Sequence, residues 1–186
     1  RHDVSSNVNP NRIDTARGLR KPGGDTASTR EGAVKIGDIL VKDSILLDLK
    51  AREKRDLLAE MANALAESTP GLDEKRLFEV LSEREKLQST GIGEGVAVPH
   101  CKLPDLSHPL TSFARSREGV DFDSIDGQPG HLFFLLVVPE YSEGRHLRAL
   151  ARISRFLRDA HFRERLWETE TREEVCRAVE EEDAKF

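Results

Sequence analysis

The segment HLFFLLVVPE, residues 131–140, contains seven consecutive apolar residues, Leu132 to Val138, between Gly130 and Pro139. An apolar run this short, with no alternating polar positions, is typical of a central strand that is covered on both faces. The segment therefore predicts a buried strand at the centre of a sheet.

Helical patterns occur on both sides of this strand along the chain. KRDLLAEMANALAES, residues 54–68, is predicted to form an amphipathic helix, and a second helix is predicted to begin with Asp73 as its N-cap. A long helix is predicted over residues 144–159, and a last helix carries a capping box, Thr171 with Glu174 three positions later. The apolar residues expected on the buried faces of the first two helices are Leu57, Leu58, Met61, Ala62, Leu65, Leu77, Val80 and Leu81.

Two further strands are predicted, one around Ser44–Leu49 and one at LTSFARS, residues 110–116. Because strands and helices alternate along the chain, we predict an α/β fold in which helices cover the sheet. Residues 34–186 are expected to form this single domain. The closing EEED run, residues 180–183, is expected to be a solvated end of the last helix.

Composition limits the classes of function. The 186 residues include 29 basic and 34 acidic side chains, and the formal net charge of -5 argues against a general affinity for nucleic acids. No apolar run approaches the roughly 18 residues of a membrane-spanning helix, and no secretory signal pattern is present, so we expect no membrane insertion. The only cysteines, Cys101 and Cys176, form no CxxC pair, which favours a cytoplasmic protein over a disulfide-bonded one.

The N-terminal residues 1–33 differ in composition from the rest. They contain no aromatic residue and few apolar ones, and they are rich in Ser, Asn, Gly and Pro. Such a stretch cannot bury enough surface to offset the entropy lost on ordering. We therefore predict a disordered tail or linker, with the domain beginning near Val34.

TGIGEGVAVPHCK, residues 90–102, combines three glycines with a loosely alternating apolar segment. Val96 and Val98 favour a strand entered through a flexible turn, and Pro99, which lacks a backbone N–H, marks its end. His100 is thus expected at a strand terminus, where ligands and chemistry gather in α/β sheets. A lone histidine in a loop is most often a solvated surface residue, so both interpretations stay open at this point.

Other chemistries for His100 fit less well. Cys101 is its neighbour on extended backbone and points to the opposite side, which disfavours a Cys–His nucleophile pair. A zinc site would need more ligands at suitable spacing, which His108, His131 and Cys176 do not supply. The sequence GIGEGV also lacks the Gly-Lys-Ser/Thr of a phosphate-binding P-loop.

On a helical wheel of residues 144–159, His146 lies on the same face as Leu150, Ile153 and Leu157. The opposite side carries Arg145, Arg148, Arg152 and Arg155. His146 is therefore predicted to point toward the sheet, at a helix N-terminus that favours a nearby anion. From periodicity alone, a hydrogen-bonded histidine at the edge of the core is the alternative.

Three separated motifs, LSEREKLQSTGIGEGVAVPHCKLPDL, VDFDSIDGQPGHLFFLLVVPE and RHLRALARISRFLRD, occur in unbroken order within residues 34–183. Together they resemble the fructose/mannitol-type enzyme IIA domains of the bacterial phosphoenolpyruvate:sugar phosphotransferase system. The RE…STGIG and DFDSIDGQP segments are most similar to the nitrogen-regulatory branch. The resemblance implies a small mixed sheet flanked by helices on both sides.

The resemblance also implies a phosphotransferase in which His100 accepts a phosphoryl group from an HPr-like phosphocarrier protein and passes it to a IIB partner. Arg84 of the RE pair and His146 match the residues that flank this histidine. The chemistry agrees, because neutral imidazole is a good nucleophile near pH 7 and Arg84 offers a planar, charged fork for phosphoryl oxygens. This scheme requires no metal and no cofactor.

Cys101 and His131 depart from the family pattern, in which a small residue and an apolar residue are more usual. A regulatory binding module remains the alternative function. In it, phosphorylation of His100 selects the target protein and no onward transfer occurs. A nucleic-acid face on the arginine-bearing helix is disfavoured by the acidic net charge, the single Trp and the single Tyr.

Overall fold

The computed structural model describes residues 34–142 and 144–186. The predicted tail, residues 1–33, lies outside the described residues, so its disorder stays a prediction. None of the helices in the described part of the chain combines the length and apolarity that crossing a membrane requires.

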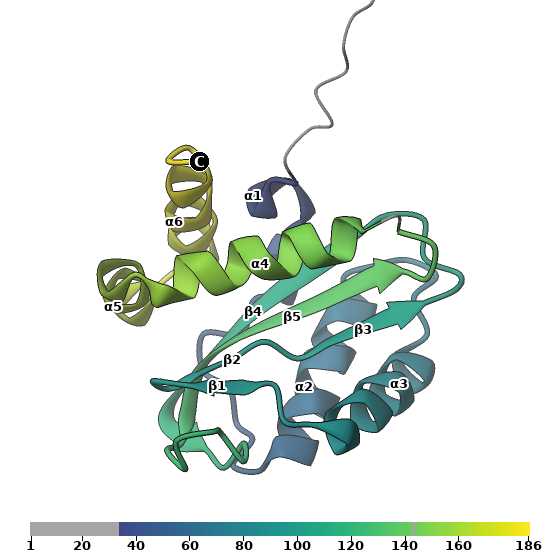
Figure 1. Cartoon of the computed structure of the whole chain (residues 1–186), viewed down its shortest axis with the longest axis horizontal. Coiled ribbons are helices and arrows are strands. Elements are labelled where there is room, and N and C mark those ends of the chain that lie inside the picture. Colours follow the sequence, from purple (N-terminus) through teal and green to yellow (C-terminus); the bar gives the residue numbers. More distant parts are fainter. Residues whose placement is uncertain (1–33, 143) are drawn as a thin grey trace, which may run out of the picture. The chain divides into compact units, whose positions relative to one another are not determined.

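A mixed, five-stranded sheet lies at the centre of the domain (Figure 1). Strand β5 (Gly130–Pro139) is the middle strand, and β4 (Leu110–Val120) pairs with it antiparallel on one side. On the other side, the short strands β2 (Val96–Ala97) and β3 (His100–Leu103) follow each other along β5 and run parallel to it. Strand β1 (Gly91–Gly93) pairs with β2 at the edge.

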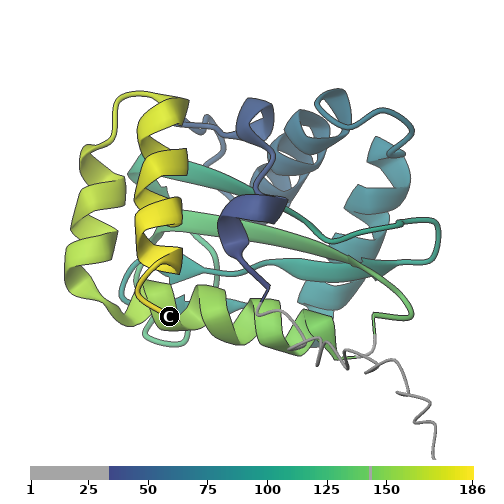
Figure 2. The ribbon, with the colours of Figure 1, turned by 90° about the horizontal axis from the view of Figure 1, so that it is seen from above.

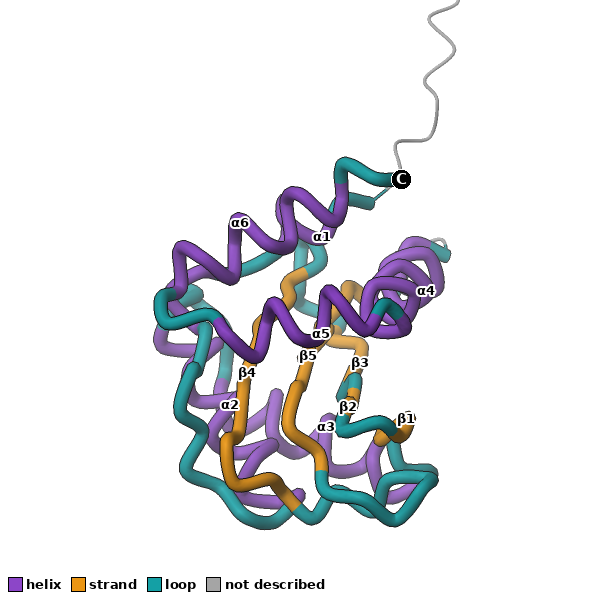
Figure 3. The backbone as a smooth tube through the Cα atoms, turned by 90° about the vertical axis from the view of Figure 1, so that its left-hand side faces the viewer, coloured by secondary structure: helices purple, strands orange, loops and turns teal. Residues whose placement is uncertain are grey.

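Helices cover both faces of the sheet, as Figures 1 and 3 show. Helices α2 (Lys54–Glu67) and α3 (Glu74–Leu87) lie on one face. Helices α4 (Arg145–Arg158), α5 (Ala160–Glu168) and α6 (Arg172–Asp183) lie on the other face, with α5 and α6 side by side in Figure 2. The predicted α/β fold, with a mixed sheet between helices, is confirmed.

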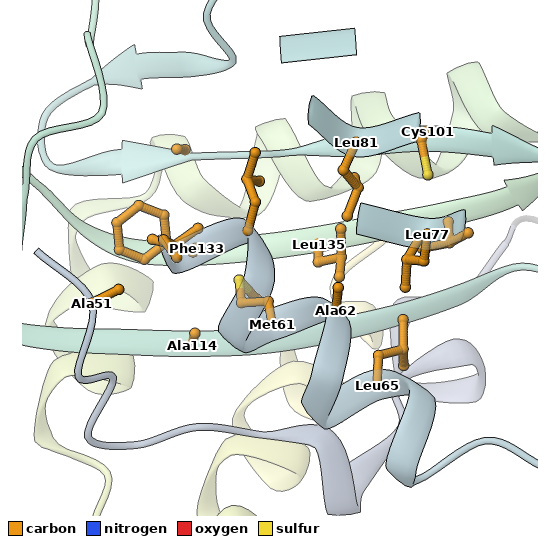
Figure 4. Close-up of a cluster of buried hydrophobic side chains, with 14 of the residues drawn as sticks. Ala51, Met61, Ala62, Leu65, Leu77, Leu81, Cys101, Ala114, Phe133 and Leu135 are labelled. Atoms are coloured by element: carbon orange, nitrogen blue, oxygen red, sulfur yellow. The ribbon is translucent and has the colours of Figure 1, made fainter. Parts of the chain in front are cut away.

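The apolar run of β5 contributes to two hydrophobic cores. Phe133, Leu135 and Val137 enter the core beneath α2 and α3, where Met61 and Leu81 lie in the same cluster (Figure 4). The alternate residues of the strand enter the core beneath α4, α5 and α6: Leu132, Phe134, Leu136 and Val138. Because successive side chains point to opposite faces, a strand covered on both faces needs an apolar residue at every position. The predicted central strand is confirmed.

The helix starts follow the predicted capping residues. The Asp73 carboxylate accepts a hydrogen bond from the Arg76 N–H at 2.7 Å and caps α3. At the start of α6, Thr171 and Glu174 form the predicted capping box. The predicted long helix is α4. Asp159 at its end also caps α5, a helix that was not predicted from the sequence.

The strand predicted around Ser44–Leu49 is wrong. Residues Lys42–Ser44 form a 3₁₀ turn, η1, and within residues 44–49 only Leu46 makes an isolated bridge to β4. The Ser44 hydroxyl donates to the Val41 carbonyl at 2.7 Å. A local hydrogen bond of this kind offers the backbone an alternative to the strand ladder, and here the turn forms instead.

The acidic run at residues 180–183 is a solvated helix end only in its first half, where Glu180 and Glu181 are exposed. Glu182 and Asp183 are only 2% and 5% exposed, so the prediction is wrong for them. The Asp183 carboxylate accepts hydrogen bonds from the first two N–H groups of α1 (Ile36–Ile39) at 3.1 and 2.7 Å, and from Nε of Arg152 at 2.7 Å. Asp183 therefore joins α1, α4 and α6.

Candidate functional site

His100 is the first residue of β3. Strand β2 ends at Ala97, and Val98 and Pro99 separate it from β3. Both strands pair with β5, and the Leu136 N–H donates to the Pro99 carbonyl at 2.9 Å across the break. Pro99 has no N–H to give to a ladder, which is the physical reason for the interruption. His100 lies at a strand terminus as expected, but this terminus is the beginning of β3 and not the end of the strand before Pro99.

The orientation of the His100 ring defines which nitrogen is available. Nδ1 lies 2.8 Å from the Val98 carbonyl, which can only accept, so the neutral ring carries its proton on Nδ1 and a lone pair on Nε2. Burial lowers the pKa of His100 below 6.5, and the charges of Arg84 and His146 lower it further. The Val98 carbonyl and the Glu85 carboxylate act in the opposite direction. The ring is therefore neutral at physiological pH.

Arg84 lies in the last turn of α3, on the chain that leads into β1. Its guanidinium donates to the Gln88 carbonyl at 3.0 Å. The neighbouring Glu85 is only 6% exposed, and its carboxylate accepts from the N–H and the hydroxyl of Thr90 at 2.7 and 2.6 Å. Lys54 Nζ lies 3.4 Å from the same carboxylate. These contacts fix the turn that carries Arg84, whose charge lowers the pKa of His100.

Glu85 is a site residue that sequence reasoning missed. The helical spacing could have indicated it, because Leu77, Leu81 and Glu85 follow one another at intervals of four residues and therefore lie on the same buried face of α3. A carboxylate on the buried face of a helix needs partners inside the protein. Glu85 has such partners in Thr90 and Lys54.

His146 is the second residue of α4 and is half-buried. Ile153 and Leu157 of the same helical face are buried, so the predicted orientation toward the sheet is confirmed. Nδ1 of His146 lies 3.1 Å from the hydroxyl of Ser142, in the loop between β5 and α4. Burial lowers the pKa of His146, and the charge of Lys102 contributes in the same direction. Among the described residues, no hydrogen bond joins the His146 and His100 rings directly, and a positive charge on His146 would lower the pKa of His100.

Lys102 is a second site residue that was missed. It follows His100 by two positions in β3, so both side chains lie on the same face of the strand. Cys101 and Leu103 point the other way, into the core beneath α2 and α3. The exposed Lys102 ammonium lies close enough to His146 to lower its pKa. The strand period of two was the signal that could have identified it.

The two departures from the family pattern have structural roles. Cys101 is buried away from the His100 ring, and burial raises the pKa of its thiol to about 12. His131 lies away from this site, with Nδ1 donating to the Ser116 carbonyl at 2.9 Å and its ring edge-to-face with Trp167. Within residues 34–142 and 144–186, no three His, Cys, Asp or Glu side chains are grouped as a metal site.

The arrangement can present one neutral, nucleophilic nitrogen together with Arg84 and His146, whose charges lower the pKa of His100, and with Lys102, which lies on the same face of β3. Comparison with known proteins shows which family contains this chain. Residues 38–182 match the family described as "Phosphoenolpyruvate-dependent sugar phosphotransferase system, EIIA 2". This match includes all three residues predicted from the sequence motifs, His100, Arg84 and His146.

Two curated relatives agree with this match. A nitrogen regulatory protein of Bradyrhizobium diazoefficiens is 47% identical over 131 residues, which are 70% of this chain and 85% of that protein. The fructose-specific EIIABC component of Bacillus subtilis is 36% identical over 150 residues, or 81% of this chain. The chain spans only 24% of the length of that second relative.

The crystal structure of the nitrogen regulatory protein IIA-Ntr from Neisseria meningitidis has the same fold. It is 38% identical, with a TM-score of 0.72, and the match covers 77% of this chain and 98% of that one. The resemblance to the nitrogen-regulatory branch is thereby confirmed. Since the matched residues contain the whole sheet and the candidate site, the chain belongs to the EIIA 2 family of the phosphoenolpyruvate-dependent sugar phosphotransferase system.

Proposed function

We propose that this phosphocarrier accepts its phosphoryl group on Nε2 of His100. The observation that supports this assignment most strongly is the hydrogen bond from Nδ1–H to the Val98 carbonyl at 2.8 Å. It keeps the proton on one ring nitrogen and leaves the other as a nucleophile. Residue pairs of this kind, a nucleophile and the group that orients it, are the usual signature of covalent catalysis.

The transfer step needs no other reactant than the donor. The Nε2 lone pair attacks the phosphorus of a phosphohistidine on an HPr-like protein. A new N–P bond forms as the donor's N–P bond breaks, and the donor ring, protonated on its other nitrogen, leaves with the bonding pair as neutral imidazole. The His100 ring becomes a phosphoimidazolium, and its Nδ1–H stays bonded to the Val98 carbonyl, which stabilises the positive charge.

Arg84, His146 and Lys102 supply the positive charge and the proton donors that the transferred group requires. Phosphoryl transfer depends mostly on positioning and on stabilising the charge spread over three equatorial oxygens. The Arg84 guanidinium can contact two of these oxygens at once. His146 donates from the first turn of α4, and the Lys102 ammonium adds a point charge on the same face as His100.

The partners follow from the same chemistry. The donor is an HPr-like phosphoprotein, and the acceptor is a IIB domain, for which the name of the Bacillus relative, an EIIABC component, is the support. The protein acts in the cytoplasm, in agreement with its two unpaired cysteines, Cys101 and Cys176.

The second candidate function is a regulatory module in which phosphorylated His100 selects a target protein without onward transfer. The relatives named nitrogen regulatory protein favour this candidate.

One reconstitution tests the acceptor assignment. The protein is incubated with phosphoenolpyruvate, enzyme I and HPr, and intact-mass spectrometry measures the gain of one phosphate. His100→Ala should abolish the gain, whereas the control His108→Ala, which changes an exposed histidine bonded to Ser107, should keep it. Labelling of His100→Ala at the wild-type rate would contradict the assignment. Adding a IIB domain then separates a relay from a signal, because only a relay loses its phosphate to that domain.

A further inference from the structure

Within the described part of the chain, the hydroxyl of Ser142 hydrogen-bonds to one side-chain atom, Nδ1 of His146, at 3.1 Å. Ser142 is 7% exposed, and its carbonyl accepts from the Arg145 N–H at 2.8 Å, which fixes it against the first turn of α4. Serine near a helix start usually serves as an N-cap. Here Gly144 occupies the N-cap position and no side chain caps α4, so the hydroxyl of Ser142 does not have that role.

The burial of Ser142 decides which partner donates. If Nδ1–H of His146 donated to the hydroxyl oxygen, the hydroxyl proton would have no acceptor among the described residues, and only 7% of Ser142 is open to water. Buried polar hydrogens are almost always bonded. The hydroxyl therefore donates to Nδ1, and the neutral His146 ring carries its proton on Nε2.

The two histidines thus have opposite tautomers. The Val98 carbonyl can only accept and holds the proton of His100 on Nδ1, whereas the Ser142 hydroxyl donates and holds the proton of His146 on Nε2. The opposite tautomers suit opposite tasks. A nucleophile needs a lone pair on Nε2, and a group that binds phosphoryl oxygens, which only accept, needs a proton there.

We propose that Ser142 is a positioning residue for phosphoryl transfer, which keeps His146 in the Nε2–H tautomer that donates to the phosphoryl group on His100. This inference rests on the function proposed above. A neutral His146 without Ser142 would divide its proton between both nitrogens, and only one of the two forms can donate. The expected cost is a slower transfer with little change in partner binding, because Ser142 is buried and offers little surface to a partner.

The chain offers a matched control for this experiment. Ser107 contacts Nδ1 of His108 at 2.9 Å in the same chemical arrangement, but on the exposed surface. The variants are Ser142→Ala, Ser142→Thr, which keeps a hydroxyl, and Ser107→Ala. For each one, ring ¹⁵N shifts at neutral pH report the tautomer of every histidine, and single-turnover transfer from phospho-HPr gives the maximal rate and the HPr concentration at half-saturation.

Wild-type protein should show His146 with Nε2 protonated and His100 with Nδ1 protonated. Ser142→Ala should mix the tautomers of His146 and lower the maximal transfer rate by at most about twofold, because an evenly divided proton halves the Nε2–H form that donates, with half-saturation unchanged. Ser142→Thr should restore both properties, and Ser107→Ala should alter neither. A wild-type His146 protonated on Nδ1 would overturn the inference before any variant is made.

Two further outcomes also count against it. These are a Ser142→Ala protein with an unchanged His146 tautomer, and one with mixed tautomers but a wild-type rate. The ring ¹⁵N measurement on wild-type protein needs no folded variant, so it decides the tautomer even where Ser142→Ala is unstable. Absence of labelling on His100 in the wild type would instead reject the proposed function, while the tautomer measurement would still test Ser142.

Discussion

At the scale of single residues, the protonation of the His100 ring controls its reactivity, because only the neutral ring has a lone pair on Nε2. Burial, Arg84 and His146 place the pKa of His100 below 6.5. An NMR titration of its ring protons should therefore give a midpoint under 6.5. Arg84→Gln should raise this midpoint, since a positive neighbour is removed. A wild-type midpoint above 6.5, or a lower midpoint in Arg84→Gln, would contradict the geometry described here.

The shape of the Arg84 side chain matters as well as its charge. A lysine at this position keeps the positive charge but cannot make two parallel hydrogen bonds to phosphoryl oxygens. Arg84→Lys should slow transfer from phospho-HPr by about ten- to a hundredfold, in the range of a lost transition-state donor. Arg76→Lys, on the exposed surface of the same helix, is the control and should transfer at the wild-type rate. Equal rates for the two variants would show that charge alone suffices.

The sequence predicted His100, Arg84 and His146 as site residues because each lies inside a motif that resembles a known family. Lys102 lies in the same motif as His100 and could have been found from the strand period of two, but Ser142 could not, since its importance depends on the ring that it approaches. Such contacts arise from the placement of α4 over the sheet, which no local pattern of residues encodes.

At the scale of secondary-structure elements, Asp183 joins three helices through charge-assisted hydrogen bonds in a buried place. Removing one partner of a buried ion pair leaves the other charge without compensation. Asp183→Ala should lower the free energy of unfolding by about 3–5 kcal/mol, measured by urea denaturation. Glu181→Ala is the control, because the Glu181 side chain is 54% exposed and pairs with Arg165 on the surface. The contribution of a surface ion pair is usually below about 1 kcal/mol. If the free energies of unfolding of Asp183→Ala and Glu181→Ala differed by no more than that, Asp183 would not have the proposed role in joining the three helices.

Secondary-structure elements could be predicted where the sequence pattern that specifies them lies within a few neighbouring residues. The apolar run of β5, the Asp73 cap and the Thr171 capping box are readable within a few residues, and the structure contains all three. The acidic run at residues 180–183 was misread because the partner of its last residue, Arg152, is 31 positions away. A charge run is solvated by default, and only the tertiary fold reveals a buried counterion.

At the scale of the whole molecule, proton binding links the site to the stability of the fold. The pKa values of His100 and His146 are lowered, mainly by burial, below the 6.5 expected for the unfolded chain. As pH falls through 6.5, the unfolded state takes up protons that the native state does not bind, so stability decreases. The carboxylates with lowered pKa values act only below their ordinary values of 3.8 to 4.5, outside this range.

The melting temperature should therefore decrease between about pH 7.5 and pH 5.5, in the window set by an ordinary histidine pKa. The His100→Asn/His146→Asn double variant should show a smaller decrease, because it lacks both linked groups. Differential scanning calorimetry at several pH values measures the effect. A double variant with the same pH dependence as the wild type would assign the proton uptake to other groups.

The anchoring of His100 has a consequence for any protein that senses its state. The residue starts a strand paired with the central strand β5, and its ring is tied to the backbone at Val98. A phosphoryl group proposed for Nε2 would therefore add its charge and its own small volume to a backbone that stays in place. A sensor would then tell the two forms apart mainly by the electric potential around one group. Discrimination of that kind weakens in concentrated salt, because dissolved ions screen the potential.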